Sequence, residues 1–489
     1  KPLIRTGPRG SGEYREASWT EALDLVAEKL LEARERHGPE SVLFLGGSGS
    51  TRGALHNTSS LPKRFLSMYG GYTERNRGYS AGAISYTTPF VLGSLDTGLY
   101  PDTIKHSGLI VLWGANIVNN RFGGMLESYI REAKRRGIRI VGIEPRRTIT
   151  IKTLCTDWVQ VYPGTDTALM LAVLHELITK DAVDREYLAK YTYGFTDLEN
   201  YVLGVEDGVP KTPEWAENIT GTPVEQTRLL TELMGNHHPV CFIPGLSIQR
   251  TIGGEDSVRL SIALQAATGS IGVLGGSTGS YTGYIRRPRV GKIGVPKNPA
   301  GVIIPTYVWP DAVLEGKAGG YPSDVHMIYN VGGNYLIQGS DLQKNIEAFK
   351  SVDFSVNHER FLTTTALYCD VILPTTTFLE RDDIISGGGN FVLFSNKVHD
   401  PLPGTMHDYD IFCELAKRLG FHEEFSEGRN KEQWLRHFVE NSEIPDYMEF
   451  KGKGIHWGQD QQNVSLSGFI KDPEKTPLET PTGKIQIRS

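Results

Sequence analysis

The chain has 489 residues, of which 39% are hydrophobic and 22% are charged, a composition typical of a globular protein with room for two to four domains of roughly 100–200 residues each. Lysine and arginine number 51 against 57 aspartates and glutamates, giving a net charge of −6, which argues against a nucleic-acid-binding surface. The 4 cysteines form no CxxC pair, which excludes an iron–sulfur or zinc framework built from this chain.

Short apolar runs alternate with helical patterns along the chain, which is typical of an α/β fold with a parallel sheet. The runs are continuously hydrophobic, which indicates strands covered by helices on both faces. The predicted strands span 41–47, 108–114, 138–145, 157–163, 239–245, 325–333, 354–359 and 370–377.

The helices between these runs carry clear boundary signals. A capping box at Ser18 predicts that the Ser18 side chain accepts from the amide of Glu21 and that the Glu21 side chain reaches back to the backbone of Ser18. The helix that starts there is predicted to end near Gly38. His237 and His238 follow another helix, and adjacent histidines do not share a helical face, so we expect a helix terminus there and not a metal site. Further helices are predicted at 122–136, 167–179, 224–234, 256–267 and 409–419.

Two stretches, 275–322 and 446–481, interrupt this alternation. Residues 275–322 are rich in proline and glycine, and their length favours either a link between two α/β units or a loop laid across a ligand. Residues 479–489 predict a turn followed by a strand. We expect the partners of that strand to lie outside this chain, because an isolated strand is not stable.

Polar, glycine-bearing loops follow many of the predicted strands. Ligands of open α/β sheets bind outside the carboxyl ends of the strands. Glycine there lets the backbone approach a phosphate, arginine pairs with phosphate oxygens, and a carboxylate accepts from ribose hydroxyls or from the paired N–H groups of guanine. The candidate residues are Gly114, Asn116, Glu144, Pro145, Arg146, Gly164, Asp166, Gly245, Ser247, Gln249, Arg250, Gly332, Gly333 and Asn334.

Each candidate also has a purely structural interpretation. A glycine after a strand is often a turn residue, Asp166 can cap a helix, and Glu144 with Arg146 can be a surface ion pair. Ser80, in the segment Tyr79–Ala83, can likewise be a helix cap. The chain contains neither GxGxxG nor a Walker sequence, and it offers no Ser-His-Asp or Cys-His pattern. Taken singly, these residues leave both interpretations open.

The ordered set of motifs resembles the dimethyl sulfoxide reductase family of molybdopterin oxidoreductases, over almost the whole chain. The motifs are GGYTERNRGYSAG (70–82), VLWGANIVNNR (111–121), GIEPRRT (142–148), YPGTDTAL (162–169), GLSIQRTIGGE (245–255), ATGSIGVLGG (267–276), VGGN (331–334), NHERFLTTTALYCDVILPTTTFLERDD (357–383) and HDYDIFCELAKRLGF (407–421).

The resemblance implies a molybdenum or tungsten ion held by two molybdopterin guanine dinucleotides, which lie on two Rossmann-like parallel-sheet domains. One domain would be discontinuous, formed by residues 1–74 and 281–476. The other, residues 75–280, would be inserted in it and carry the metal-ligand loop, and residues 477–489 would begin a further domain. A segment before Lys1 would hold a [4Fe–4S] cluster. Lacking both flanking parts, the chain alone is expected to bind cofactor weakly or not at all.

The resemblance also assigns roles to single residues. Ser80 matches the side chain that binds the metal, with Tyr79 beside it in the catalytic centre, and serine there resembles the branch that reduces S-oxides and N-oxides. The matching dinucleotide-binding positions are Gly114, Asn116, Glu144, Pro145, Arg146, Gly164, Asp166, Gly245, Ser247, Gln249 and Arg250 in the inserted domain and Gly332, Gly333, Asn334, Glu359 and Thr363 in the other. Glu359 stands where the family more often has aspartate, and Leu246-Ser247 where it more often has Trp-Gly.

The reaction implied is oxygen-atom transfer from an S-oxide or N-oxide in anaerobic respiration. Electrons would come from an iron–sulfur subunit and a membrane anchor subunit, which places the protein on the periplasmic or extracytoplasmic side, associated with the membrane through its partners. The alternatives are a serine-ligated relative that transfers a hydroxyl group or works in the oxidative direction, a cofactor-free scaffold for electron-carrying subunits, and an ordinary nucleotide-binding module.

Overall fold

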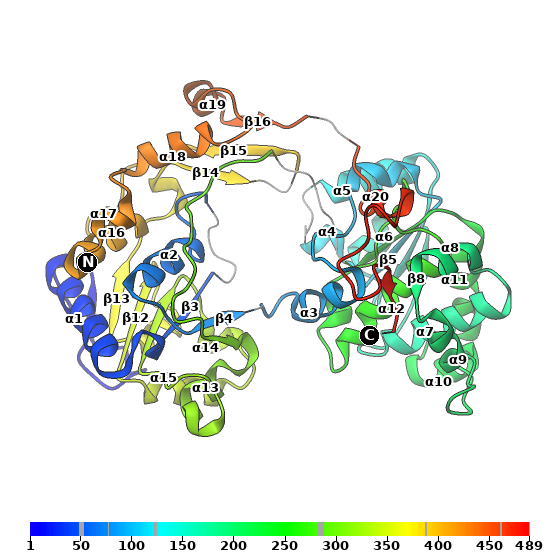
Figure 1. Cartoon of the computed structure of the whole chain (residues 1–489), viewed down its shortest axis with the longest axis horizontal. Coiled ribbons are helices and arrows are strands. Elements are labelled where there is room, and N and C mark those ends of the chain that lie inside the picture. The colour runs from blue at the N-terminus through cyan, green and yellow to red at the C-terminus, as the bar shows by residue number, and fades with distance from the viewer. Residues whose placement is uncertain are drawn as a thin grey trace. The chain divides into compact units, whose positions relative to one another are not determined.

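The computed structural model of the chain describes residues 1–47, 53–76, 78–120, 125–280, 288–386, 389–459 and 462–488. The chain forms two compact units, both drawn in Figure 1. The first unit comprises Lys1–Tyr79, Arg287–Gly387 and Phe391–Gln459, and the second comprises Ser80–Arg286, Gly388–Asn390 and Asp460–Ser489. Each unit contains a parallel sheet with helices on both faces, which confirms the predicted α/β class.

The first unit is built on a six-stranded sheet with the order β2-β1-β13-β12-β11-β3. Strands β3, β11, β12 and β13 are parallel, and β1 and β2 add an antiparallel edge. The register places Tyr329 between Phe44 and Val356. The bounds are β1 Leu3–Arg5, β2 Tyr14–Glu16, β3 Val42–Gly46, β11 Met327–Val331, β12 Phe354–Glu359 and β13 Val371–Pro374.

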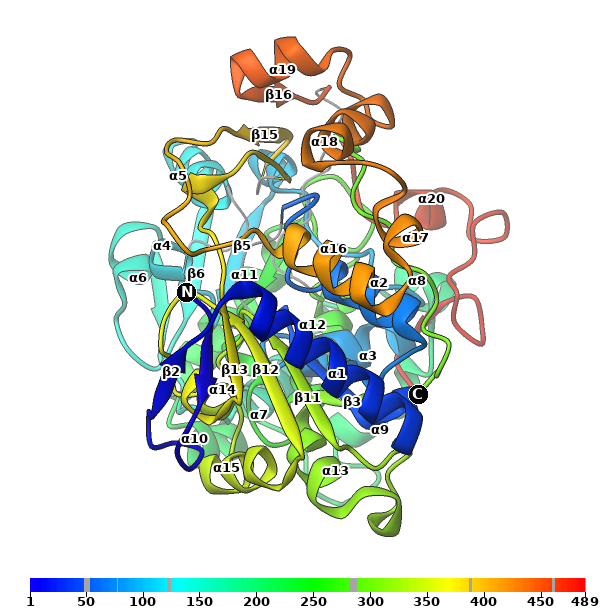
Figure 2. The ribbon, with the colours of Figure 1, turned by 90° about the vertical axis from the view of Figure 1, so that its left-hand side faces the viewer.

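Helices cover both faces of this sheet because successive strand residues point to opposite sides. Phe44 and Tyr329 pack with helices α1 (Trp19–His37), α2 (Ser60–Tyr69) and α16 (Asp408–Leu419), and Figure 2 shows α1 running across this face. Leu43 and Ile328 pack on the other side with α13 (Trp309–Glu315), α14 (Tyr335–Gln338) and α15 (Leu342–Ser351). Burial on both faces explains the continuous apolar runs.

The start of α1 follows the predicted cap only in part. Ser18 accepts from the amide of Glu21 at 3.1 Å, as expected. The carboxylate of Glu21 accepts chiefly from Arg15, at 2.5 Å, and the backbone N–H of Ser18 is a weaker partner. The helix ends before Gly38, whose φ of 84° lies in the region that glycine adopts without strain.

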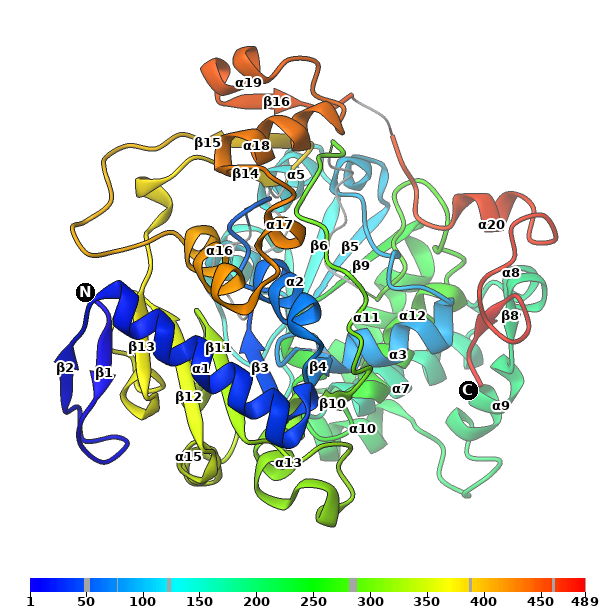
Figure 3. The same ribbon diagram turned by 60° about the vertical axis from the view of Figure 1, so that its left-hand side comes forward.

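Smaller elements complete the first unit. A three-stranded antiparallel sheet of β14 (Asp383–Ser386), β15 (Phe391–Ser395) and β16 (Ile455–Trp457) lies beside helices α18 and α19, as Figure 3 shows. The remaining bounds are β4 Glu74–Asn76, β10 Ile303–Pro305, α17 His422–Ser426, α18 Lys431–Glu440 and α19 Tyr447–Lys453.

The second unit has a four-stranded parallel sheet with the order β7-β6-β5-β9. Val111 and Phe242 pack toward α7 and α12, whereas Ile110 and Ile243 pack toward the side of α5. The bounds are β5 Leu109–Trp113, β6 Arg139–Ile143, β7 Asp157–Val159, β8 Thr192–Tyr193, β9 Val240–Pro244, α3 Gly82–Leu92, α4 Ile117–Asn120, α5 Leu126–Arg135, α6 Ile149–Thr153, α7 Asp166–Thr179, α8 Arg185–Tyr191, α9 Phe195–Val202, α10 Pro213–Thr220, α11 Val224–Asn236, α12 Gly254–Ala267, α20 Ser467–Lys471 and β17 Ile485–Gln486.

The unit boundaries differ from the predicted domain boundaries at two places. Strand β4 pairs with β10, which keeps residues 75–79 in the first unit. The C-terminal segment 462–488 belongs to the second unit, where Phe469 and Ile485 are buried in its core. Strand β17 pairs in parallel with β8, so the expectation that its partners lie outside this chain is wrong.

The stretch 275–322 is more structured than its composition suggests. It contains β10 and α13, and Trp309 at the start of α13 is fully buried. Residues 281–287 within it lie outside the described part of the chain. The histidines His237 and His238 directly follow α11, and the backbone N–H of His237 bonds to the carbonyl of Leu233, as expected for a helix terminus.

Candidate functional site

The parallel sheet of the second unit gathers most of the predicted residues at one edge. Strands β5, β6, β7 and β9 run in the same direction, so the loops that follow them emerge from the same side of the sheet. These loops hold Gly114, Asn116, Glu144, Pro145, Arg146, Gly164, Asp166, Gly245, Ser247, Gln249 and Arg250.

Two of these loops touch through glycine. A Cβ at Gly245 would overlap the carbonyl oxygen of Gly114, and a Cβ at Gly114 would overlap the hydroxyl of Ser247. Gly114 also has a φ of 62°. The hydroxyl of Ser247 donates to the carbonyl of Gly114 at 2.9 Å. The close approach of the β5 and β9 loops therefore requires both glycines.

Asp166 begins α7 inside the unit and is only 8% exposed. Its carboxylate accepts from the indole N–H of Trp113 at 2.8 Å. Burial raises the pKa of Asp166, and the Trp113 hydrogen bond opposes that shift. The purely structural interpretation makes Asp166 the N-cap of a helix. The N-cap residue of α7 is Thr165 instead, so that interpretation is wrong.

Glu144, at the end of β6, is also buried. Burial raises its pKa to about 7, the nearby Arg146 guanidinium opposes the shift, and Asp166 adds to it. Within the described ranges, no hydrogen bond reaches the Glu144 carboxylate and no salt bridge joins it to the exposed Arg146. The end of β6 thus holds the buried carboxylate of Glu144 and the exposed guanidinium of Arg146, and no salt bridge joins the two.

Other predicted residues of this edge make local contacts. The side-chain oxygen of Asn116 accepts from the hydroxyl of Thr150 at 2.7 Å, and the carbonyl of Pro145 accepts from Gln160 at 2.9 Å. Gly164 has a φ of 81°. These contacts fix the shape of the loops, and within the described ranges no hydrogen bond engages the amide nitrogen of Asn116.

The segment that contains Ser80 is held through its main chain. The carbonyl of Ser80 accepts from Nε2 of Gln249 at 2.8 Å and from Nε of Arg250 at 3.0 Å. Oε1 of Gln249 in turn accepts from the backbone N–H of Ala83 at 3.1 Å. Both Gln249 and Arg250 therefore position the Ser80 segment, a role that sequence inspection missed.

The hydroxyl of Ser80 is exposed and bonds to nothing in the part of the chain that the structure describes. Helix α3 has Ala81 at its cap position, with no side-chain cap. The interpretation of Ser80 as a helix cap is therefore wrong. Among the described residues, its main chain is therefore held by two hydrogen bonds and its hydroxyl by none.

Tyr79 belongs to the first unit. Its hydroxyl donates to the carbonyl of Thr306 at 3.2 Å, and its ring meets Tyr307 edge to face. Burial raises the pKa of Tyr79. Arg75 nearby donates to the hydroxyl of Thr306 at 2.9 Å and stacks on Tyr335.

The predicted residues of the first unit follow β11 and β12. Gly332 has a φ of 60°, and its N–H donates to the carbonyl of His358 at 3.0 Å. A Cβ at Gly333 would overlap the ring of Tyr335. Both glycines are thus required by the turn itself.

The side chains of Asn334, Glu359 and Thr363 are engaged locally. Oδ1 of Asn334 accepts from the backbone N–H and the hydroxyl of Thr365, at 3.1 and 2.8 Å. Oε1 of Glu359 accepts from the N–H of Arg360 at 2.7 Å, and Oγ1 of Thr363 accepts from the N–H of Ala366 at 3.2 Å. These contacts shape the loops, and a ligand role for the three residues stays a prediction.

Sequence inspection also missed a buried polar cluster beyond β13. Asp383 accepts from the backbone N–H groups of Leu55 and His56, at 3.2 and 3.0 Å. Burial acts to raise the pKa of Asp383, but the bonds from His56 and the backbone outweigh it and leave the pKa lowered. Arg381 is buried in the same cluster. The sequence feature that could have indicated this cluster is the polar stretch that follows the buried strand β13.

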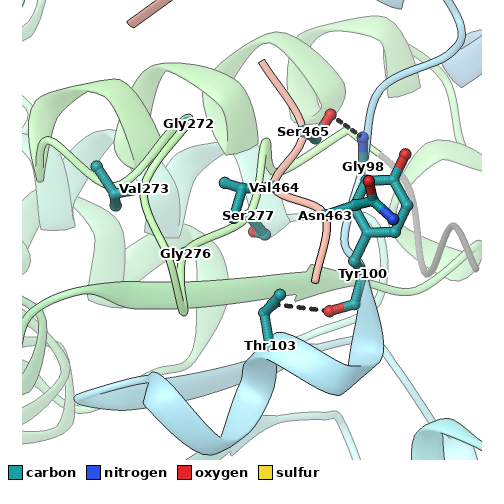
Figure 4. Close-up of a pocket in the computed structure, with 10 residues that line it drawn as sticks. All are labelled: Gly98, Tyr100, Thr103, Gly272, Val273, Gly276, Ser277, Asn463, Val464 and Ser465. Atoms are coloured by element: carbon teal, nitrogen blue, oxygen red, sulfur yellow. Dashed lines mark hydrogen bonds between the residues drawn. The ribbon is translucent and has the colours of Figure 1, made fainter. Parts of the chain in front are cut away.

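A small cavity in the second unit involves other residues (Figure 4). Its volume is about 10 Å³, which leaves room for roughly one water molecule. Ser465 accepts from the N–H of Gly98 across it at 3.2 Å. None of the predicted site residues lines it, so it is not the site of a large ligand.

Comparisons with known proteins connect these loops to a family. Residues 1–418 match the family model described as molybdopterin oxidoreductase. The chain is 32% identical to dimethyl sulfoxide reductase DmsA of Escherichia coli (strain K12), over all of this chain and 65% of that protein. It is 31% identical to dimethyl sulfoxide/trimethylamine N-oxide reductase of Rhodobacter capsulatus, over 98% of this chain and 64% of that protein.

The fold agrees with these matches. Acetylene hydratase from Pelobacter acetylenicus superimposes with a TM-score of 0.77 and 20% identity, over 99% of this chain and 69% of that chain. The chain thus spans about two thirds of the length of its relatives. Because the family match covers both parallel-sheet units and the strand-end loops described above, the chain belongs to the molybdopterin oxidoreductase family.

Proposed function

We propose that the protein containing this chain is a molybdopterin-dependent oxidoreductase that removes oxygen from S-oxides or N-oxides, with Ser80 as the protein ligand of the metal. Relatives that match almost the whole chain support this proposal, because they are named as dimethyl sulfoxide or trimethylamine N-oxide reductases. The observation that carries the proposal is the Ser80 segment, whose main chain is bonded and whose hydroxyl has no hydrogen-bond partner among the described residues.

The donor set of the second unit fits an anionic dinucleotide with guanosine at one end. Gly114 and Gly245 let the loops after β5 and β9 meet, and we propose that main-chain groups of these loops contact the phosphates. Glu144 and Asp166 offer buried carboxylates that can accept from ribose hydroxyls and guanine N–H groups. Arg146 adds an exposed guanidinium suited to phosphate oxygens. We propose that the second unit binds one molybdopterin guanine dinucleotide in this way.

The first unit offers a comparable set of residues, but the side chains of Asn334, Glu359 and Thr363 are engaged in hydrogen bonds with residues of the strand-end loops. Gly332 and Gly333 form a tight turn after β11, and one carboxylate oxygen of Glu359 is bonded to the backbone. We propose that these residues, with Asn334 and Thr363, contact a second dinucleotide.

The bound group supplies the metal and the two-electron redox chemistry of oxygen-atom removal. The oxygen of Ser80 is a hard ligand that suits an oxophilic ion better than a thiolate does. Gln249 and Arg250 orient Ser80 by holding its carbonyl. The hydroxyl of Tyr79 is protonated at neutral pH and donates to the carbonyl of Thr306, so it would have to exchange that bond in order to donate to a substrate oxygen.

We further propose that electrons reach this centre from outside the chain. A [4Fe–4S] cluster in a preceding segment, an iron–sulfur subunit and a membrane anchor subunit would supply them, on the extracytoplasmic side of a membrane. The relatives named as dimethyl sulfoxide reductases support this arrangement only through their similarity to this chain.

Turnover by the intact protein tests the proposal. With reduced methyl viologen as electron donor, the protein should reduce dimethyl sulfoxide or trimethylamine N-oxide. Ser80→Ala should lose at least about 100-fold in kcat, which corresponds to roughly 2.7 kcal/mol, while circular dichroism and the unfolding midpoint stay unchanged. Ser11→Ala, at an exposed serine of the first unit, is the control and should keep full activity. A fully active Ser80→Ala variant would contradict the assignment of the ligand.

A further inference from the structure

A second group of metal-ligating side chains lies on the first unit, away from the residues discussed so far. His37, His326 and Asp353 each offer one ligand atom, and these atoms all lie within 4.8 Å of one another. We propose that these three residues form a binding site for a divalent transition-metal ion of the zinc class, which no part of the proposed redox chemistry uses.

The main chain fixes the positions of the three residues. His37 is the last residue of α1. His326 directly precedes β11, and its N–H donates to the carbonyl of Ser41, in the link between α1 and β3, at 2.9 Å. Asp353 directly precedes β12, and its N–H donates to the carbonyl of His326 at 2.9 Å. The cluster therefore lies where α1 ends against the sheet, and its backbone is held by hydrogen bonds.

The side chains already face one another. The two imidazole rings are stacked, with 3.6 Å between their centroids and an angle of 8° between their planes. Nδ1 of His326 lies 2.8 Å from Oδ2 of Asp353. To bind a common ion, the two imidazole rings would have to turn about their side-chain bonds out of this stacked arrangement.

The chemistry of the three donors selects the ion. Two imidazoles and one carboxylate suit Zn²⁺ and its neighbours in the transition series, whereas Ca²⁺ and Mg²⁺ prefer oxygen ligands alone. Three protein ligands leave a fourth tetrahedral position for water. His37 and Asp353 are exposed, so solvent reaches that position directly.

The surrounding charges do not block the site. Glu32, one turn before the end of α1, is paired with Lys29 and Arg36 at 2.6 and 2.7 Å. Arg9 contacts the main-chain carbonyl of Asp353 at 3.4 Å, and its guanidinium is paired with Asp370. The carboxylate of Asp353 thus has His326 as its partner among the described residues.

The site lies at the opposite edge of the sheet from the predicted dinucleotide residues. His326 precedes β11, whereas Gly332 and Gly333 follow it, and five residues of strand span about 17 Å. A bound ion would therefore fasten the end of α1 to the sheet. It would stabilise the first unit by mass action without taking part in electron transfer.

Calorimetric titration of the purified chain with Zn²⁺ tests the site. The wild-type chain should bind one Zn²⁺ at this site, and His37→Gln or His326→Gln should weaken that binding at least about tenfold. Asp353→Asn should weaken it as well. His399→Gln, at an exposed histidine of the same unit that belongs to no such cluster among the described residues, should leave binding unchanged.

The unfolding midpoint, measured with and without Zn²⁺, is a second readout. It does not depend on the redox site, and it shows whether each variant is folded. Zn²⁺ should raise the unfolding midpoint of the wild-type chain and of His399→Gln, but not that of His37→Gln. Absence of stoichiometric binding by the folded wild-type chain would overturn the proposal. So would Zn²⁺ affinity that is unchanged in the folded His37→Gln variant, which would place the bound ion elsewhere.

Discussion

A buried carboxylate without a hydrogen-bond donor among the described residues distinguishes the end of β6 from an ordinary turn. Glu144 is 8% exposed, yet no hydrogen-bond donor of the described chain reaches its carboxylate. A buried charge in this state is costly, and its pKa is accordingly raised to about 7. Such a residue lowers stability unless a ligand donates to it, which is the physical basis for assigning it to the ribose or base of a bound nucleotide.

The pH dependence of stability follows from Glu144. Its pKa is raised on folding from 4.5 to about 7, so the folded state holds the proton longer than the unfolded state, and stability falls as the pH rises from about 4.5 to 7. Glu144→Gln should therefore be more stable than the wild type at pH 8 by up to about 3 kcal/mol, and similar to it at pH 4.5. Urea unfolding of the cofactor-free chain at several pH values measures this. A constant difference across the pH range would contradict it.

Gln249 is the residue whose removal should disturb Ser80 without touching its hydroxyl. Gln249→Met keeps the volume but removes the bonds to the carbonyl of Ser80 and the N–H of Ala83. We expect a loss of about 1–3 kcal/mol in unfolding free energy and a larger fall in kcat than rise in KM, measured by urea unfolding and steady-state turnover. Gln338→Met, at an exposed position in α14, is the control. Equal turnover in both variants would mean that Gln249 does not position Ser80.

At the scale of elements, the carboxyl ends of β5 and β9 form one joint structure. The loops after these strands meet at Gly114 and Gly245, with Ser247 bonded across them. The strand pairing sets the distance between the loops, and the absence of two side chains permits their contact. Packing of this kind makes a glycine essential even where its backbone conformation is ordinary.

Gly245→Ala should therefore be strongly destabilising. Its new Cβ would overlap the carbonyl oxygen of Gly114, and overpacking costs typically 1–3 kcal/mol. Gly452→Ala is the control, because a Cβ there meets nothing within 4 Å and the position lies inside α19, where alanine is favoured by about 1 kcal/mol. Thermal and urea unfolding of both variants should shift in opposite directions. A neutral Gly245→Ala would show that the loops can separate at no cost.

The strands were the most predictable elements. All eight predicted apolar runs contain a strand of the six-stranded or the four-stranded sheet. Helices cover both faces of these two sheets, which favours uninterrupted hydrophobic residues in their strands. The contacts of single side chains were less predictable. The carboxylate of Glu21 bonds chiefly to Arg15, and Asp166 bonds to Trp113. Both depend on neighbours that only the folded chain brings near.

At the scale of the whole molecule, the chain leaves the first unit, forms the second and returns. It then contributes its last segment, 462–488, to the second unit. This final crossing could not be predicted, because it rests on β17 pairing with β8 and on Phe469 packing against Tyr191, contacts between residues more than 270 positions apart. The parallel topology predicts that the strand-end residues lie at the same edge of the sheet. It does not predict the hydrogen bonds from Gln249 and Arg250 to the carbonyl of Ser80.

The two units should respond separately to core mutations. Phe469→Ala removes a ring that is 3% exposed in the core of the second unit, which typically costs about 3–5 kcal/mol. Hydrogen exchange should accelerate in the second-unit strands β5, β6 and β9 and stay unchanged in the first-unit strands β3, β11 and β12. Phe90→Ala, at a ring 54% exposed, should change neither. Acceleration confined to the first unit would contradict the placement of the C-terminal segment.

The most direct test of the central claim is the metal and nucleotide content of the intact protein. If the intact protein binds two molybdopterin guanine dinucleotides and one metal ion, the purified protein should contain molybdenum or tungsten, and acid hydrolysis should release two guanine nucleotides per metal ion. A correctly folded intact protein with neither metal nor guanine, isolated from cells that make the cofactor, would contradict the account.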